Sequence, residues 1–127
     1  YCWIINISKF DEKSNLSKDM ILYKIKTIKL KIIFPDNYPF APPFIMVISP
    51  KFNIKTGHVT KEGALCMELL TPQHWSPLYT VENLIMQIKI LILESDGRLD
   101  EKLYNEEYNY ESAKISFERV ARGNSRL

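Results

Sequence analysis

The sequence predicts a single α+β domain in which short strands come first and helices follow. Apolar residues alternate with polar ones before residue 35, as in strands, and recur at helical spacing after residue 80. All seven prolines lie between these regions, at positions 35, 39, 42, 43, 50, 72 and 77. Because proline lacks a backbone donor and fixes φ, this central window has room only for short strands and loops.

Length and composition exclude several classes of protein. The 127 residues suffice for one domain, and 46% hydrophobic with 25% charged residues is typical of a folded chain. The formal net charge of +2 is too small to indicate nucleic-acid binding. No apolar run reaches the ~18 residues that span a bilayer, and no signal peptide is recognisable. Two cysteines without paired spacing favour a reducing compartment, and we expect the cytoplasm or the nucleus. We also expect a monomer that binds neither a membrane nor nucleic acid.

Three strand regions are predicted before residue 50. Residues 1–7 form the first, residues 10–17 a polar hairpin loop, and residues 20–34 a second strand region. Within the latter, one face carries apolar residues (Ile28, Leu30, Ile32 and Phe34) and the other carries lysines, which we interpret as solvated rather than as a binding patch. The opposite parity of residues 21, 23 and 25 requires a bulge or turn near residues 26–27. Residues 45–48 form a short buried strand.

Two helices are predicted in the second half. Thr80 is an expected N-cap, and Glu82 in the first turn complements the helix dipole. The apolar stripe after it is so wide, including Met86 and Ile90, that we expect a central helix covered on most sides. A last helix is expected from about Tyr110 to Ala121. Its inward residues are expected to be Ile115, Phe117 and Val120, with Gly123 as its C-terminal stop.

Cys66 is the side chain with the clearest chemical potential. A lone cysteine is most often a buried and inert residue, but Gly63 and Ala64 are expected to leave space beside the sulfur. Irregular segments such as this one also concentrate functional residues. His58 and His74 lack the spacing of a zinc site, no protease signature surrounds Cys66, and no phosphate-binding glycine loop is present. The sequence therefore predicts neither a metal nor a bound cofactor.

Several segments together resemble the ubiquitin-conjugating enzyme family. The segment FPDNYPFAPP at residues 34–43, GALCMELLT at residues 63–71, WSP at residues 75–77 and the apolar helix after them follow that family's order and spacing. The segments at 63–71 and 86–88 are most similar to its Q branch. The resemblance implies a four-stranded antiparallel meander packed against helices and a cis Tyr38–Pro39 bond. Residues 1–127 would form the core domain, truncated at its amino end, with the family's first helix expected upstream of Tyr1.

The resemblance also implies an activity and partners. Cys66 would accept ubiquitin from the activating enzyme as a thioester and pass it to a substrate amine or hydroxyl, usually with a RING-type or other ligase. The chain would thus be a transferase that needs no cofactor, because ATP is consumed by the activating enzyme. Phe40, Trp75, Pro77 and Leu78 match loops that bind these partners. The alternative is a catalytically inactive member of the same fold that only binds ubiquitin as a scaffold.

Two departures from the family pattern concern catalysis. Most members have an Asn eight residues before the cysteine, where this chain has His58, and the Q branch carries a Tyr there. His58 would either donate a hydrogen bond or act as a base in catalysis, or would merely brace the loop. Many members have an acidic residue that assists deprotonation of the acceptor lysine. The matching position in this chain is not acidic, and Asp96 and Asp100 only lie near it in the sequence. Lysine as the acceptor is therefore less secure, and hydroxyl acceptors become plausible.

Overall fold

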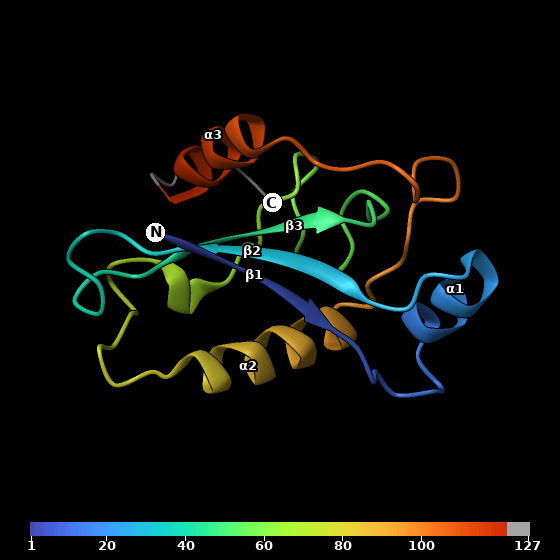
Figure 1. The fold of residues 1–127 in the computed structure, drawn as a ribbon, viewed down its shortest axis with the longest axis horizontal. Helices are drawn as coiled ribbons and strands as arrows, with labels where there is room; N and C mark the ends of the chain where they lie inside the picture. Colours follow the sequence, from blue (N-terminus) through green and yellow to red (C-terminus); the bar gives the residue numbers. More distant parts are fainter. Residues whose placement is uncertain (122–127) are drawn as a thin grey trace.

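A computed structural model describes residues 1–121 of the chain (Figure 1). The order of elements is β1 (Cys2–Ile7), α1 (Asn15–Tyr23), β2 (Ile28–Ile33), β3 (Phe44–Ser49), a 3₁₀ turn η1 (Glu68–Leu70), α2 (Val81–Glu94) and α3 (Tyr110–Ala121). The α+β class and the strand-then-helix order are as predicted, apart from α1. Within the described residues no helix has the length and apolar content needed to cross a membrane.

The strands form an antiparallel sheet of three strands in the order β1-β2-β3. The family resemblance led us to expect four strands. A short stretch does extend the sheet beyond β3, through the N–H of Val47 to the Gly63 carbonyl oxygen (2.8 Å) and the N–H of Leu65 to the Ile45 carbonyl oxygen (3.0 Å). This pairing amounts to a single bridge, Met46 to Ala64, because a turn at residues 60–63 comes directly before it and η1 follows soon after.

The two faces of the sheet pack against different helices, α2 on one side and α3 on the other (Figure 1). The alternation predicted for β2 is confirmed, because Ile28, Leu30 and Ile32 are fully buried in the main core. Leu84, Ile88 and Ile92 of α2 belong to the same core. The apolar cluster on the opposite face of the sheet is smaller, and in it Met46 of β3 packs with Ala64 and Ala113. The segment around Ala64 therefore packs against β3 on the side that α3 covers.

The most important difference from the sequence prediction is α1. Residues 15–23 were expected to be partly hairpin loop and partly strand, and they form a helix instead. Ser14 caps it by accepting a hydrogen bond from the N–H of Ser17, and its buried side chains (Leu16, Asp19 and Met20) follow helical spacing. Lys24 ends the helix in a left-handed conformation, so the parity change that we attributed to a bulge near residues 26–27 is a helix end. The register shift lies between Lys29 and Leu30.

The two later helices begin where they were predicted, but their exposed faces differ. On α2, Met86 is 62% exposed and Ile90 is 45% exposed, so this helix is not covered on most sides. On α3, Ile115 points outward with 54% exposure, because the packed face follows the spacing of Ala113 and Ser116. Phe117 and Val120 lie partly buried on that face, as expected. Gly123 lies outside the described residues.

The predicted Tyr38–Pro39 bond is cis in the structure, and so is Ser49–Pro50. Residues 34–43 form a loop whose aromatic rings meet in succession. The ring of Phe34 contacts that of Tyr38, with centroids 4.7 Å apart, and Tyr38 in turn contacts Trp75 at 6.1 Å. This chain of rings fixes the proline-rich loop against the segment that precedes α2.

A charged pair ties α1 to the segment after α2. The guanidinium of Arg98 donates to both carboxylate oxygens of Asp19, from Nε at 2.8 Å and from a terminal nitrogen at 2.9 Å. The N–H of Leu99 also donates to Asp19, whose residue exposure is only 7%. Hydrogen bonding to Arg98 lowers the pKa of the Asp19 carboxyl below its usual value, against the opposing effect of burial. The pair is therefore bidentate and partly desolvated, which is the geometry in which such a contact contributes to stability.

We predict that Arg98→Met lowers the free energy of unfolding at pH 7 by about 2 kcal/mol, because it leaves a buried carboxylate with only one donor. The pKa of Asp19 is lowered in the folded state, so the contribution is present above the ordinary aspartate pKa and disappears as pH falls through the lowered value. Urea unfolding of both proteins from neutral to acid pH measures the difference. Lys26→Met, at an exposed position, serves as control. An equal loss in both variants, or a loss independent of pH, would contradict this account.

Candidate active site

Cys66 lies at the end of a small hairpin that spans residues 58–66. Its N–H donates to the carbonyl oxygen of His58 at 2.9 Å, and the N–H of Thr60 donates to the carbonyl oxygen of Ala64 at 2.8 Å. The turn between these arms contains Gly63, whose φ of +102° is unfavourable for residues with a side chain. The hairpin therefore places Cys66 beside His58, which is the pair that the sequence analysis singled out.

The glycine has a different role from the one expected. Gly63 does not leave space beside the Cys66 sulfur, because a Cβ there would lie 2.4 Å from the ring of Tyr108. The hydroxyl of Tyr108 accepts a hydrogen bond from the N–H of Phe52 at 2.7 Å, and burial raises its pKa to about 12. Tyr108 thus braces the hairpin as a neutral phenol. Sequence reasoning did not find this residue, since nothing in its local sequence connects it to residue 63.

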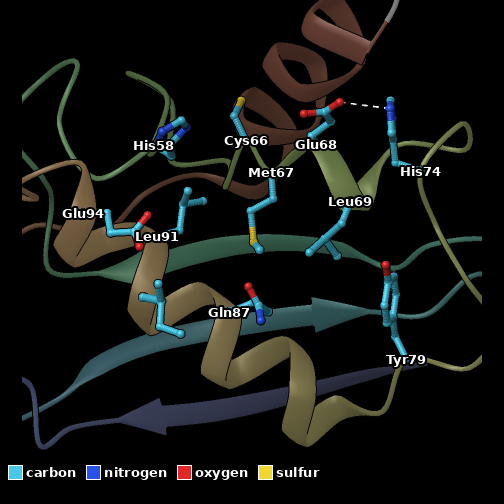
Figure 2. A pocket seen from close by; sticks show the side chains of 11 residues that line it. His58, Cys66, Met67, Glu68, Leu69, His74, Tyr79, Gln87, Leu91 and Glu94 are labelled. Atoms are coloured by element: carbon cyan, nitrogen blue, oxygen red, sulfur yellow. Dashed lines mark ion pairs between the residues drawn. The ribbon is translucent and has the colours of Figure 1, made fainter.

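The thiol of Cys66 is partly buried and opens onto two grooves, which share Cys66 and His58 as a common wall. Figure 2 shows the sulfur directed away from the sheet, between the His58 ring on one side and the Glu68 carboxylate on the other. Burial raises the pKa of the thiol to about 11. The group is accessible, but it is a neutral thiol at physiological pH.

The first groove, here called the α2 groove, has a volume of about 540 Å³ and runs from Cys66 along α2. Glu68 and His74 lie on one of its walls, where the carboxylate and the imidazole Nε2 are 2.9 Å apart. The hydroxyl of Thr71 donates to the Glu68 carbonyl oxygen at 2.6 Å and lies 3.2 Å from Nδ1 of His74. Residues of α2 (Gln87, Ile90, Leu91 and Glu94) form the other wall. Sequence reasoning missed this exposed pair, because its members are six residues apart in a segment without regular periodicity.

The second groove, here called the α3 groove, has a volume of about 560 Å³ and lies between the loop of residues 54–62 and helix α3. Its charged lining residues are Lys55, Lys61, Glu62 and Arg119. The α2 groove, in contrast, is lined by two carboxylates and by no lysine or arginine of the described chain. The two approaches to Cys66 therefore differ in charge.

His58 is exposed and has a φ of +57°, in the left-handed region. Its backbone carbonyl holds Cys66, while its ring lines both grooves and has no hydrogen-bond partner among the described residues. Within the described residues, the bond that links His58 to Cys66 is therefore made by the His58 backbone and not by its ring. Asp96 and Asp100 do not line either groove: Asp96 accepts from Asn15, and Asp100 accepts from the backbone of Lys102 and Leu103.

The residues expected to bind partners lie in the two loops that Trp75 joins. Phe40 is 77% exposed, Leu78 is 87% exposed, and Pro77 precedes Leu78 in the chain. Trp75 is different, because it is half-buried and its Nε1 donates to the Pro39 carbonyl oxygen at 2.8 Å. Trp75 thus connects the loops that carry the exposed side chains. Its ring also contacts Tyr79, which lines the α2 groove.

Comparison with known proteins gives the family of the chain. A family profile described as ubiquitin-conjugating enzyme matches residues 13–122. A Q-like ubiquitin-conjugating enzyme of Drosophila melanogaster is 43% identical over 79% of this chain and 32% of its own length. The human Q-like protein 1 is 41% identical over 79% of this chain and 61% of its own, and the human ubiquitin-conjugating enzyme Q1 is 37% identical over 92% and 28%. A solved ubiquitin-conjugating enzyme of Plasmodium vivax superposes with a TM-score of 0.55 at 27% identity, covering 72% of this chain and 73% of that one.

The chain spans less than two thirds of the length of each of these sequence relatives. The family match nevertheless covers most of the chain, including the hairpin with Cys66, the proline-rich loop and α2. From this match and these relatives, the chain belongs to the ubiquitin-conjugating enzyme family, in its Q branch.

Proposed function

We propose that this chain accepts ubiquitin as a thioester on Cys66 and transfers it to an amine or hydroxyl of a substrate protein. The observation that carries the proposal is the sulfur itself, which opens onto two grooves beside His58. In the first step, the Cys66 sulfur attacks the thioester carbonyl on the activating enzyme. The carbon–sulfur bond to that enzyme breaks, and its cysteine leaves as a thiolate while the proton of Cys66 is lost to solvent. In the second step, an acceptor displaces Cys66 in the same way.

The α2 groove is the better candidate for the tail of the bound ubiquitin. It leads from Cys66 along α2, where the partly exposed Ile90 lines it and the exposed Met86 lies on the same helix. A folded donor linked through its tail needs an apolar surface beside the reactive atom, and weak exchangeable contacts typically use small apolar patches. The carboxylates of Glu68 and Glu94 would favour a tail with basic side chains.

Phe40, Pro77 and Leu78 are proposed to contact the activating enzyme and a ligase in turn. Their exposure, together with the anchoring of both loops by Trp75, gives a rigid apolar surface next to the α2 groove. Rigid apolar side chains are the usual centres of binding energy in such interfaces.

The first prediction about the proposed function concerns formation of the thioester. Incubated with activating enzyme, ATP and ubiquitin, the chain is expected to gain one ubiquitin in a linkage that a thiol reductant cleaves. Cys66→Ser is expected to give a reductant-resistant ester or no adduct, while Cys2→Ser, which removes the other cysteine, is expected to charge normally. Intact-mass measurement before and after reduction reads the result. Absence of an adduct would favour the scaffold alternative, whereas a reductant-sensitive adduct that persists in Cys66→Ser would place the thioester on Cys2 and refute the assignment of Cys66.

A second prediction follows from the raised pKa of the Cys66 thiol. In a Cys2→Ser background, the rate of alkylation by iodoacetamide is expected to rise with pH and to level off near the pKa of about 11. The urea-unfolded chain should level off near the ordinary cysteine value of about 8.5. Because the folded state favours the neutral thiol, the folded chain reacts more slowly at pH 7 than the unfolded chain. A native profile that levels off below that of the unfolded chain would show that the surroundings favour the thiolate instead.

A third prediction assigns His58 to the transfer step. His58→Gly removes the ring and tolerates the left-handed backbone, and it is expected to slow discharge on the order of 10²-fold while charging changes little. His58→Asn keeps a hydrogen-bond donor and should retain most of the rate if the ring acts as a donor; if it acts as a base, this variant should be slow as well. Lys24→Gly is the control, because Lys24 is also exposed and left-handed but lines neither groove. Rates are measured separately for charging and for single-turnover discharge, and equal effects on both steps would refute the role.

A further inference from the structure

We propose that the α3 groove binds the acceptor, and that the acceptor it favours is an acidic segment of the substrate protein. In such a segment, glutamate, aspartate or phosphorylated side chains flank the residue that receives ubiquitin. This inference rests on the proposed thioester at Cys66. It goes beyond that proposal by assigning a second site and the chemistry of its ligand.

The position of the groove gives the first argument. Cys66 and His58 line both grooves, so the sulfur is at the boundary between them. If the donor tail lies in the α2 groove, the thioester carbonyl can be approached from the α3 side. An acceptor in that groove would meet the carbonyl carbon beside the His58 ring. Its nitrogen or oxygen would bond to that carbon, the bond to the Cys66 sulfur would break, and the acceptor's proton would pass to a base such as His58 or to solvent.

The charge of the rim gives the second argument. Lys55, Lys61 and Arg119 are exposed and line the groove, and none of them forms an ion pair within residues 1–121. Lys55 and Lys61 come from the loop on one side, whereas Arg119 comes from α3 on the other. Glu62 is the single carboxylate in this lining among the described residues. Three cations thus face one cleft from both sides, and none has a carboxylate partner of its own in that part of the chain. Such a cleft complements an acidic ligand.

The floor of the groove gives the third argument, because it is largely apolar and already hydrogen-bonded. The hydroxyl of Ser116 donates its one proton to the Ala113 carbonyl oxygen at 2.8 Å. In the contact between the Thr60 and Ser116 hydroxyls, at 3.1 Å, Thr60 is therefore the donor. Thr60 in turn accepts from the N–H of Ala64 at 2.9 Å. These bonds attach α3 to the Cys66 hairpin and leave the floor with little need for a polar ligand. Recognition therefore falls to the charged rim, and an extended segment would find apolar contact with Ile54, Val59 and Val120.

The test uses the full chain, first charged with ubiquitin and then offered two peptides with the same acceptor residue. One peptide carries glutamates on both sides of the acceptor and the other carries lysines at those positions. The acceptor is a serine or a threonine, and the flanking lysines are blocked by dimethylation, which keeps their charge. The wild-type chain is expected to discharge to the acidic peptide about tenfold faster, and this preference should shrink as salt rises.

Charge reversal supplies the decisive variant. Lys61→Glu combined with Arg119→Glu is expected to abolish or invert the preference while charging remains normal. Lys26→Glu, an exposed residue that does not line the groove, is the matched control and should keep the wild-type preference. Lys55 is left unchanged, because its φ of +68° couples substitution to backbone strain.

The outcomes separate this inference from the proposed function. Failure of the wild-type chain to charge would overturn the thioester proposal and the present one with it. Normal charging followed by equal discharge to both peptides would overturn the acceptor assignment alone. Another outcome is that the charge-reversed variant charges poorly and keeps the wild-type preference for the acidic peptide once it is charged. That result would place the donor ubiquitin in the α3 groove and would likewise refute the acceptor assignment. The salt dependence of the wild-type preference decides the matter if the double variant does not fold.

Discussion

The backbone hydrogen bond from Cys66 to the His58 carbonyl oxygen is the contact on which the arrangement of the site depends. It closes the hairpin of residues 58–66, and the bonds from Val47 and Leu65 fix that hairpin to the edge of β3. As a result, the sulfur lies at the boundary of two grooves rather than within either one. This bond is the last of the contacts between the two arms of the hairpin, after those of Thr60 with Ala64, and it holds Cys66 directly beside His58.

The burial that positions the sulfur also affects its chemistry. A thiol with a raised pKa is a weak nucleophile at neutral pH, because only about 10⁻⁴ of it is ionised when the pKa is near 11. The same property makes the thiolate a poorer leaving group, which slows loss of the acyl group to water. For the proposed transfer, the raised pKa would therefore slow both the charging of Cys66 and the hydrolysis of its thioester.

Much of the fold could be predicted from the sequence because its elements have strong local signals. The alternation in β2 and the Thr80 cap with the apolar stripe of α2 both correspond to what the structure shows. Helix α1 was missed because the apolar Ile21, Tyr23 and Ile25 alternate as in a strand, whereas the helix is held by a long-range contact of Asp19 with Arg98. For the site, the resemblance to the family singled out Cys66 and the position eight residues before it, which His58 occupies. The contact of Tyr108 with Gly63 and the difference in charge between the grooves could not be predicted, since each combines segments far apart in the chain.

The most direct test of this account is a crystal structure of the ester formed when Cys66→Ser is charged with ubiquitin. We expect the tail of ubiquitin to lie in the α2 groove, its carbonyl to be bonded at residue 66 beside the His58 ring, and the groove between Lys61 and Arg119 to stay open. A tail that lies in the α3 groove, or an acyl group attached at any other residue, would contradict it.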